Sequence, residues 1–246
     1  MSHNSQEYPS TLYIQSQFQE ELNTVEEKLS LAFSELYTPL SGLVRSQVQQ
    51  AKPHLRAAVV LVVAHSPHGD SQLREKRLFL AAALEMLYVA LNVHQLLLNN
   101  RTQIEDTIDK SVLGSTILAG DYCFSFAASL AARTDSPEVV AIFSETLQAI
   151  SERQLRSLFD PSQPATAAAL QESEPFDASA ELFQAGIQAA NALVKLDSRA
   201  LDAHAEMVQS LIAQLLHRKI SLPIQESLLN PTQKAYWSAL VQWHNQ

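Results

Sequence analysis

Glycine and cysteine are both scarce in this chain. Only 5 of its 246 residues are glycine, and Cys123 is the single cysteine. A β-sheet protein of this length would need more glycine in its turns, so the composition argues against sheet. A lone cysteine excludes an internal disulfide and a zinc cluster built on cysteines, and it fits a reducing compartment. Because Cys123 lies among apolar residues, we interpret it as a buried and inert thiol.

Positive charge is also in short supply. The chain has 17 lysines and arginines against 26 acidic residues, for a net charge of −9, and it contains no basic run. This argues against nucleic-acid binding through a positive face. The most apolar stretch, 78–98, still contains Glu85, His94 and Gln95, which indicates a buried helix rather than a membrane span. The N-terminus lacks the pattern of a signal peptide. We therefore expect a soluble cytoplasmic protein with no transmembrane segment.

Leucine and alanine dominate instead, with 36 and 32 residues. Both have high helix propensity, and apolar residues recur at three- and four-residue spacing, as in amphipathic helices. We predict an all-α fold: one domain over residues 1–246, a bundle of about nine or ten helices, with residues 1–9 flexible. The expected helices cover residues 10–36, 41–50, 55–64, 71–100, 112–133, 136–159, 177–195, 198–221 and a last one from 230. Asp70, Ser136 and Asp177 are expected to cap three of them, and Asn230-Pro231 begins the last.

Two segments carry a specific likeness to a known family. One reads Leu84-Glu-Met-Leu-Tyr-Val-Ala-Leu-Asn-Val-His94; the other reads Leu118-Ala-Gly-Asp-Tyr-Cys-Phe124, followed later by Ile150-Ser-Glu-Arg-Gln-Leu155. Together they resemble the trans-isoprenyl diphosphate synthase (polyprenyl synthetase) family. In that family an alanine-rich helix ends in His-Asp-Asp-x-x-Asp, and later helices carry Leu-Ala-Gly-Asp-Tyr-Leu and Ile-Ser-Glu-Gly-Glu. The resemblance covers most of residues 20–220 and implies an isoprenoid-synthase-like bundle around a deep apolar pocket.

The family's chemistry depends on metal ligands that this chain lacks. The resemblance implies ionisation of an allylic diphosphate and its elongation with isopentenyl diphosphate. That reaction needs Mg²⁺ held between diphosphate oxygens and two aspartate-rich motifs. After His94, the first motif is replaced by Gln95, Leu96 and Asn99, none of which is anionic. We therefore expect no metal site and no catalytic residue at this position.

The second motif is replaced as well. Its expected position holds Arg218, Lys219 and Leu222, so cations stand where anions are needed. Two like charges at ligand distance oppose each other by several kcal/mol even at an effective dielectric constant of about 20. The family's basic diphosphate-binding motif is partly retained, as Lys52 and Arg56. These two residues fit either a retained diphosphate site or solvated cations at a helix start, and we favour the second reading.

Two further features have two readings each, and a third has one. Glu105, Asp106 and Asp109 have the spacing of a displaced aspartate motif, but capping of the next helix explains them better than metal binding. His94 corresponds to the family's histidine, and without aspartates after it a hydrogen-bonded core histidine is the favoured role. Asp121, with its neighbour in the Leu-Ala-Gly-Asp-Tyr segment, is expected to be structural.

A helical frame without metal ligands resembles the small, non-catalytic component of two-component hepta- and hexaprenyl diphosphate synthases. The resemblance implies a catalytic polyprenyl diphosphate synthase subunit as partner, in a heterodimer or larger assembly, with Mg²⁺ only in that partner. The helices at 112–133 and 136–159 are the expected interface, marked by exposed apolar residues. The alternatives are a stand-alone protein that binds an isoprenoid or other lipid in the apolar pocket and, ranked lowest, an enzyme that uses the acidic segment 105–109.

Overall fold

The computed structural model describes residues 11–36, 38, 41–42, 44–45, 54–65, 70–99, 110–158, 179–214, 220–221 and 229–245. Within these residues the chain forms eight α-helices and no strand, which confirms the predicted all-α class. The helix expected at 41–50 lies mostly outside them. The helices are α1 (Thr11–Glu35), α3 (Leu55–Val63), α4 (Ser71–Asn99), α5 (Lys110–Ala132), α6 (Pro137–Leu158), α8 (Ser179–Val194), α9 (Ser198–Gln214) and α10 (Pro231–His244).

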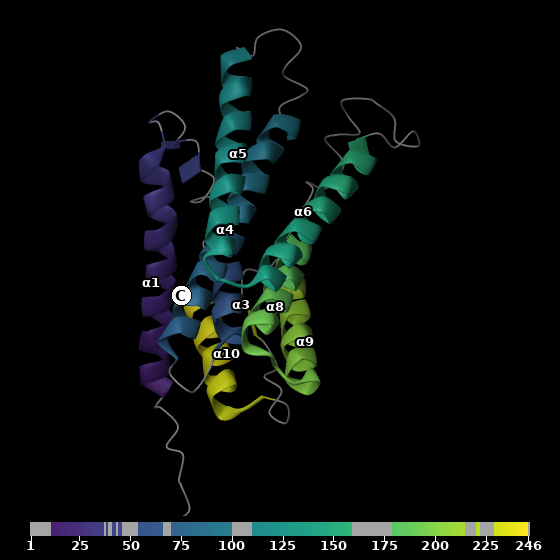
Figure 1. Ribbon diagram of the computed structural model, residues 1–246. Helices are drawn as coiled ribbons and strands as arrows, with labels where there is room; N and C mark the ends of the chain where they lie inside the picture. The colour runs from purple at the N-terminus through teal and green to yellow at the C-terminus, as the bar shows by residue number, and fades with distance from the viewer. Residues whose placement is uncertain are drawn as a thin grey trace, which may run out of the picture.

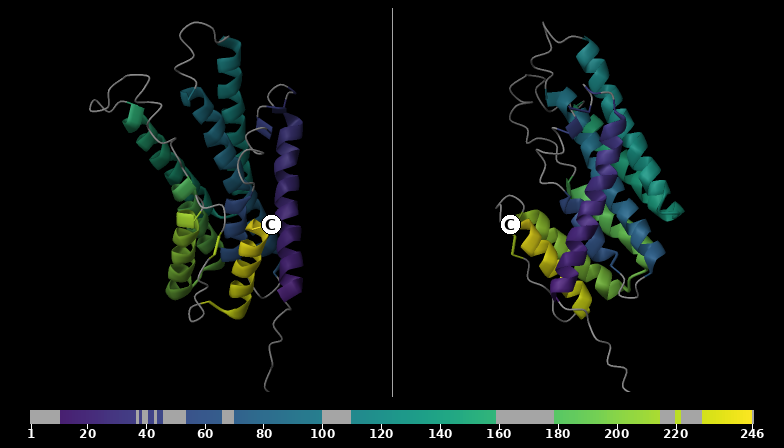
Figure 2. Two further views of the ribbon diagram at one scale, coloured as in Figure 1. Left: turned by 180° about the vertical axis from the view of Figure 1, so that it is seen from behind. Right: turned by 90° about the vertical axis from the view of Figure 1, so that its left-hand side faces the viewer.

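Helix α4 is the centre of the bundle. The helices α1, α3, α5 and α8 all pack against it. Every residue of the short helix α3 is buried, which agrees with its apolar sequence on all faces. Helix α5 lies at one edge of the bundle and α10 at the opposite edge (Figure 2). Figure 1 shows that the end of α5 lies next to the start of α6 and that the two helices diverge from this junction.

Burial also explains the hydropathy of α4. The stretch Ser71–Gln95 is long and apolar enough to cross a membrane, but 78% of its most apolar window is buried inside the protein. A fully buried Leu, Met or Phe side chain contributes about 1.5–3 kcal/mol of stability. The apolar block Leu78–Leu84 is buried throughout. The apolar side chains of this block are therefore buried in the helix bundle.

Local capping chemistry defines several helix starts. The Asp70 carboxylate accepts hydrogen bonds from two backbone N–H groups in the first turn of α4, at 2.9 and 3.3 Å. The Ser136 hydroxyl accepts one at the start of α6, at 3.4 Å. Asn230 and Gln233 form a reciprocal capping box on α10, with bonds of 2.9 and 3.0 Å. Asp177 lies outside the described residues.

The predicted end of the helix at 198–221 is wrong. Helix α9 is described as far as Gln214, and Ile220 and Ser221 are not helical. The backbone of Ile220 instead pairs with the Asn245 side chain, through bonds of 3.0 and 2.8 Å. The N–H of Ser221 donates to the side chain of Gln214 at 2.8 Å. These bonds satisfy the backbone outside a helix, and nothing in the local sequence indicates them.

A buried ionic cluster fastens both ends of the described chain to the core. Glu21 of α1 is fully buried and contacts the guanidinium of Arg77 on α4. Arg77 also reaches Nδ1 of His65 at 3.0 Å, and the His65 ring stacks on Tyr236 of α10 with ring centroids 3.9 Å apart. Arginine can only donate, so Nδ1 of His65 is the acceptor. Burial, assisted by the Arg77 charge, lowers the pKa of His65 to about 3.

Candidate functional site

The residues that the resemblance aligns with the first aspartate motif lie at the end of α4. Gln95 is half-buried there, and its Oε1 accepts a hydrogen bond from Nε2 of Gln154 on α6 at 2.8 Å. Leu96 and Asn99 belong to the last turns of α4, but their side chains are outside the described part. A neutral amide bridge between α4 and α6 therefore stands where the resemblance places a carboxylate. Mg²⁺ sites are normally built on carboxylates, which Gln95 does not supply.

His94, one residue earlier, packs on the backbone of α5. A Cβ at Gly120 would overlap the His94 ring, so the glycine of the Leu-Ala-Gly-Asp-Tyr segment is needed for this close approach. The ring stacks on Phe124 with centroids 5.1 Å apart. Its Nε2 lies 3.4 Å from Oδ1 of Asp121, which is longer than an ordinary hydrogen bond. His94 is thus held mainly by ring contacts, with a loose polar contact to Asp121.

His94 and Asp121 differ in charge and in exposure to solvent. Burial lowers the pKa of His94, and the nearby Asp121 charge only partly offsets that effect. His94 is therefore neutral at pH 7. The Asp121 side chain, in contrast, is 59% exposed. In the free chain water solvates this carboxylate, so its charge needs no compensation by His94.

Arg56, which the resemblance assigns to the basic motif, lies at the start of α3. Arg56 is buried, with its Nη1 3.6 Å from Oε2 of Glu85 and its Cζ 3.3 Å from the ring centroid of Tyr88. The other oxygen of Glu85 accepts the N–H of Ala57 at 2.9 Å, so a residue of α4 caps α3. His54, the N-cap residue by position, has φ 73° and makes no side-chain cap. The reading of Arg56 as a solvated surface cation is wrong, and its role toward a diphosphate stays a prediction.

The other predicted positions lie outside the described residues: Lys52, Glu105, Asp106, Asp109, Arg218, Lys219 and Leu222. The capping and metal readings of the acidic segment, and the cationic second motif, therefore stay predictions. In the part of the chain that the structure describes, no group of three His, Cys, Asp or Glu side chains could hold a metal ion.

The rest of the Leu-Ala-Gly-Asp-Tyr helix is structural in character. The Tyr122 hydroxyl donates to the carbonyl of Ala32 at 3.0 Å and so links α5 to α1. Cys123 is fully buried, and burial raises the pKa of its thiol to about 12. A thiol with that pKa is not a nucleophile at neutral pH, which supports the inert reading of Cys123.

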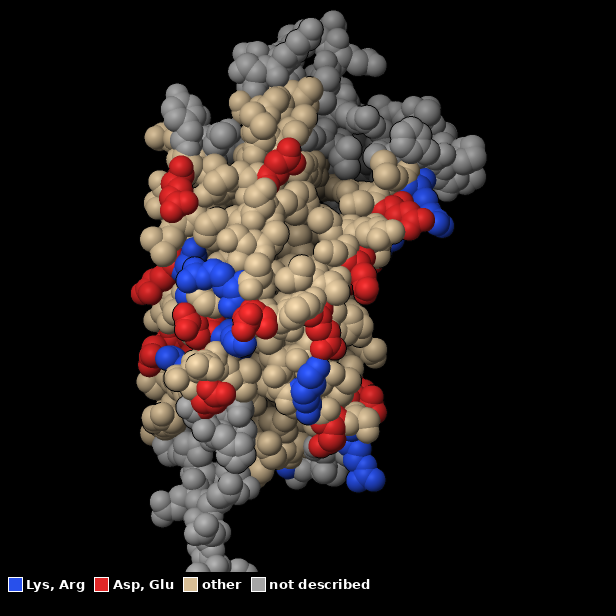
Figure 3. All heavy atoms as spheres, viewed as in Figure 1, with Lys and Arg blue, Asp and Glu red and all other residues tan. Residues whose placement is uncertain are grey.

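The outer surface of α5 is short of charge. Asp121 is the one charged residue of the chain between 113 and 132. We call the exposed side of α5 the α5 face. In Figure 3 few charged groups lie over the upper half of α5, which points away from the start of α6. Most charged groups lie lower in the view and along its edges. On α6, Val140 and Leu155 are also exposed, by 40% and 55%. The α5 face consists of Ile117, Leu118, Asp121, Ser125, Ala128, Ser129 and Ala132.

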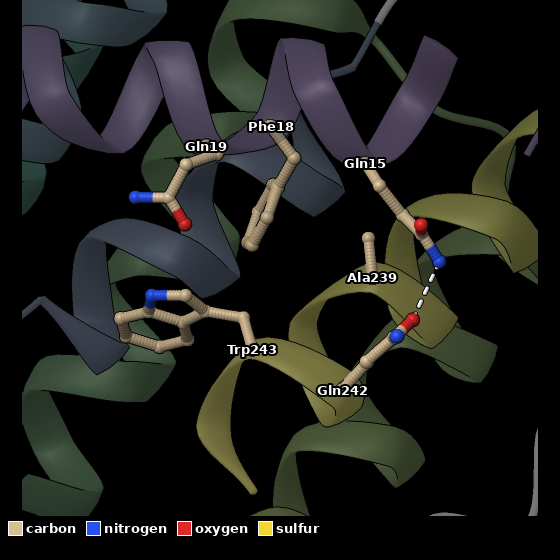
Figure 4. Close-up of a pocket in the computed structure, with 6 residues that line it drawn as sticks. All are labelled: Gln15, Phe18, Gln19, Ala239, Gln242 and Trp243. Carbon is tan, nitrogen blue, oxygen red and sulfur yellow. Dashed lines mark hydrogen bonds between the residues drawn. The ribbon is translucent and has the colours of Figure 1, made fainter. Parts of the chain in front are cut away.

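A small pocket lies between α1 and α10. Phe18, Ala239 and Trp243 form its apolar side, and three glutamines line the remainder (Figure 4). Two of these, Gln15 and Gln242, bond to each other at 2.5 Å. The pocket holds about 70 Å³, whereas sites for small-molecule ligands have about 300–1,000 Å³. It is too small for an isoprenoid chain.

Sequence reasoning missed two residues of these sites. Gln154 belongs to the Ile-Ser-Glu-Arg-Gln segment that carries the resemblance, but a single glutamine gives no sign of its partner. Glu85 is part of the alanine-rich helix, and its burial beside an apolar block was the only available signal. Both act on residues 28 or more positions away.

Comparisons with known proteins agree with the fold. No family model matches the sequence, and no curated protein matches it. The structure is similar to a geranylgeranyl pyrophosphate synthase from Lactobacillus brevis, with a TM-score of 0.55 and 14% identity over 94% of this chain and 84% of that one. It is also similar to the geranylgeranyl pyrophosphate synthetase of the archaeon Geoglobus acetivorans, with a TM-score of 0.51 and 15% identity over 92% and 87% of the two chains. The chain thus shares the all-α fold of these prenyl synthases.

Proposed function

We propose that this chain is the non-catalytic subunit of a heteromeric trans-polyprenyl diphosphate synthase. It supports long-chain product formation by a catalytic partner that carries both aspartate-rich motifs and the Mg²⁺ ions. One observation carries the proposal: in a prenyl synthase fold, the position of the first motif is taken by Gln95, whose side chain is bonded to Gln154 at 2.8 Å. A synthase of this kind needs anionic oxygens at that point to hold Mg²⁺ on the leaving diphosphate.

The α5 face supports a protein partner. Leu118 is 65% exposed, and the surrounding positions are small or apolar with one carboxylate. Apolar surface of this kind is typical of protein interfaces, whose centres contain few charged residues. Val140 and Leu155 on α6 are exposed as well, next to exposed charged residues such as Glu152 and Arg156. We therefore place the contact with the catalytic subunit on α5 and α6.

A prenyltransferase assay tests the proposal. The purified chain is given labelled isopentenyl diphosphate, an allylic primer and Mg²⁺, alone and after co-expression with the polyprenyl synthase of its own source organism. We expect no product from the chain alone and longer products from the mixture than from the synthase alone. Turnover by the pure chain that disappears on Asp106→Ala and Asp109→Ala would instead establish the acidic segment as catalytic.

A pair of matched surface variants tests the docking site. Leu118→Glu places a charge on the α5 face, while Leu31→Glu places one on α1 at a residue of similar exposure, 63%. We expect Leu118→Glu to abolish co-purification with the synthase and Leu31→Glu to leave it intact. Equal loss with both variants would contradict the assignment. If wild type forms no complex and carries a co-purified isoprenoid detected by mass spectrometry, the chain is a lipid-binding protein instead.

A further inference from the structure

Asp121 presents a problem for any protein that covers the α5 face. It is the one charged residue of that face, and in the free chain water solvates its exposed carboxylate. Covering the face removes that water. An ionised carboxylate without a cationic partner is costly to bury, by several kcal/mol in practice. A positive charge beside Asp121 therefore favours docking.

His94 is placed to supply that charge. Its Nε2 lies 3.4 Å from the Asp121 carboxylate, and the contact between its ring and Gly120 fixes the ring at this position. Among the described residues, Asp121 is also the only charged group that acts on the His94 ring. The ring that stacks on His94, Phe124 of α5, is neutral.

We propose that His94 takes up a proton when a catalytic prenyl synthase chain covers the α5 face, so that docking is linked to pH. The inference rests on the partner proposed above. In the free chain His94 is neutral at pH 7, since burial disfavours its charged form. In the complex the dehydrated Asp121 carboxylate stabilises the imidazolium at short range, where the attraction is strong because water is excluded.

The direction of the pH effect follows from linkage. The complex binds more protons than the separated chains wherever the pH lies between the lower pKa of free His94 and its higher pKa in the complex. Docking is therefore tightest below that window and weakens as the pH rises through it. For one proton, the dissociation constant can rise by at most about tenfold per pH unit.

The experiment is a titration of the chain with its co-expressed polyprenyl synthase by isothermal calorimetry at pH 6.0, 7.0 and 8.0. We expect the wild-type dissociation constant to rise severalfold or more across this range, with proton uptake on binding. His94→Gln and Asp121→Asn are both expected to remove that rise. Asp202→Asn, which removes an exposed carboxylate on α9, is the matched control and is expected to keep it.

The possible failures are distinguishable. A complex whose affinity does not change between pH 6.0 and 8.0, or a His94→Gln variant that keeps the wild-type slope, overturns the proton linkage and leaves the subunit proposal standing. Absence of a complex at every pH overturns both. A further readout is the NMR titration of the His94 ring, whose pKa should be higher in the complex than in the free chain.

Discussion

Replacement of Gly120 by alanine tests the packing that holds His94. In the interior of α5, alanine is favoured over glycine by about 1 kcal/mol of helix propensity. A Cβ at this position would overlap the His94 ring, however, so the ring has to leave its stack on Phe124. Forcing an extra methyl group into a packed site costs about 1–3 kcal/mol. We expect Gly120→Ala to be neutral or to destabilise the fold by up to about 2 kcal/mol.

Gly114 provides the matched control on the same helix. A Cβ there meets nothing within 4 Å, so Gly114→Ala should stabilise the fold by about 1 kcal/mol. The difference between the two variants in urea unfolding, followed by far-ultraviolet circular dichroism, measures the overlap with His94 alone. In a His94→Ala background, Gly120→Ala should become stabilising like Gly114→Ala. If Gly120→Ala stabilises the wild-type chain as much as Gly114→Ala does, the packing argument is refuted.

Three other predictions concern buried groups. Glu85→Gln should destabilise the fold by about 3–5 kcal/mol in urea unfolding, because it removes the buried carboxylate 3.6 Å from the Arg56 guanidinium; a loss below about 1 kcal/mol would contradict this. Burial lowers the pKa of His65 to about 3 and that of His204 to about 4, so the unfolded chain binds more protons below pH 6.5. Stability should therefore fall as the pH drops below about 6.5, by about 1.4 kcal/mol per pH unit for each histidine at most, and His65→Gln should reduce the slope. Cys123 should react with a thiol reagent only in denaturant, and fast labelling of the native chain would show that it is not buried.

Local signals in the sequence were sufficient for the helices and several of their starts. Asp70 and the Asn230 capping box act on residues within the next turn, so their partners are visible in the sequence itself. The burial of the apolar block of α4 could likewise be predicted from its composition. The all-α class follows from such short-range patterns, because each helix is specified mainly by spacing and caps.

The polar contacts of the site could not be predicted in the same way. Glu85 caps a helix that starts 30 residues earlier, and Gln95 meets Gln154 only because α4 and α6 come together in the bundle. Arg56 looked like a surface cation because arginine is rarely buried, and its burial depends on a carboxylate from another helix. Pairings of this kind are set by three-dimensional packing, which one sequence does not reveal.

The contact between α1 and α10 has a consequence for the order of folding. Phe18 of α1 is covered edge-on by Tyr236 and Trp243, with ring centroids 6.0 and 6.3 Å away. Phe18 is synthesised more than two hundred residues before those rings exist. The apolar side of α1, together with the buried Glu21, must wait for α10 before that end of the bundle can close. During synthesis the nascent chain therefore presents an uncovered helix face that chaperones can recognise until α10 has been made.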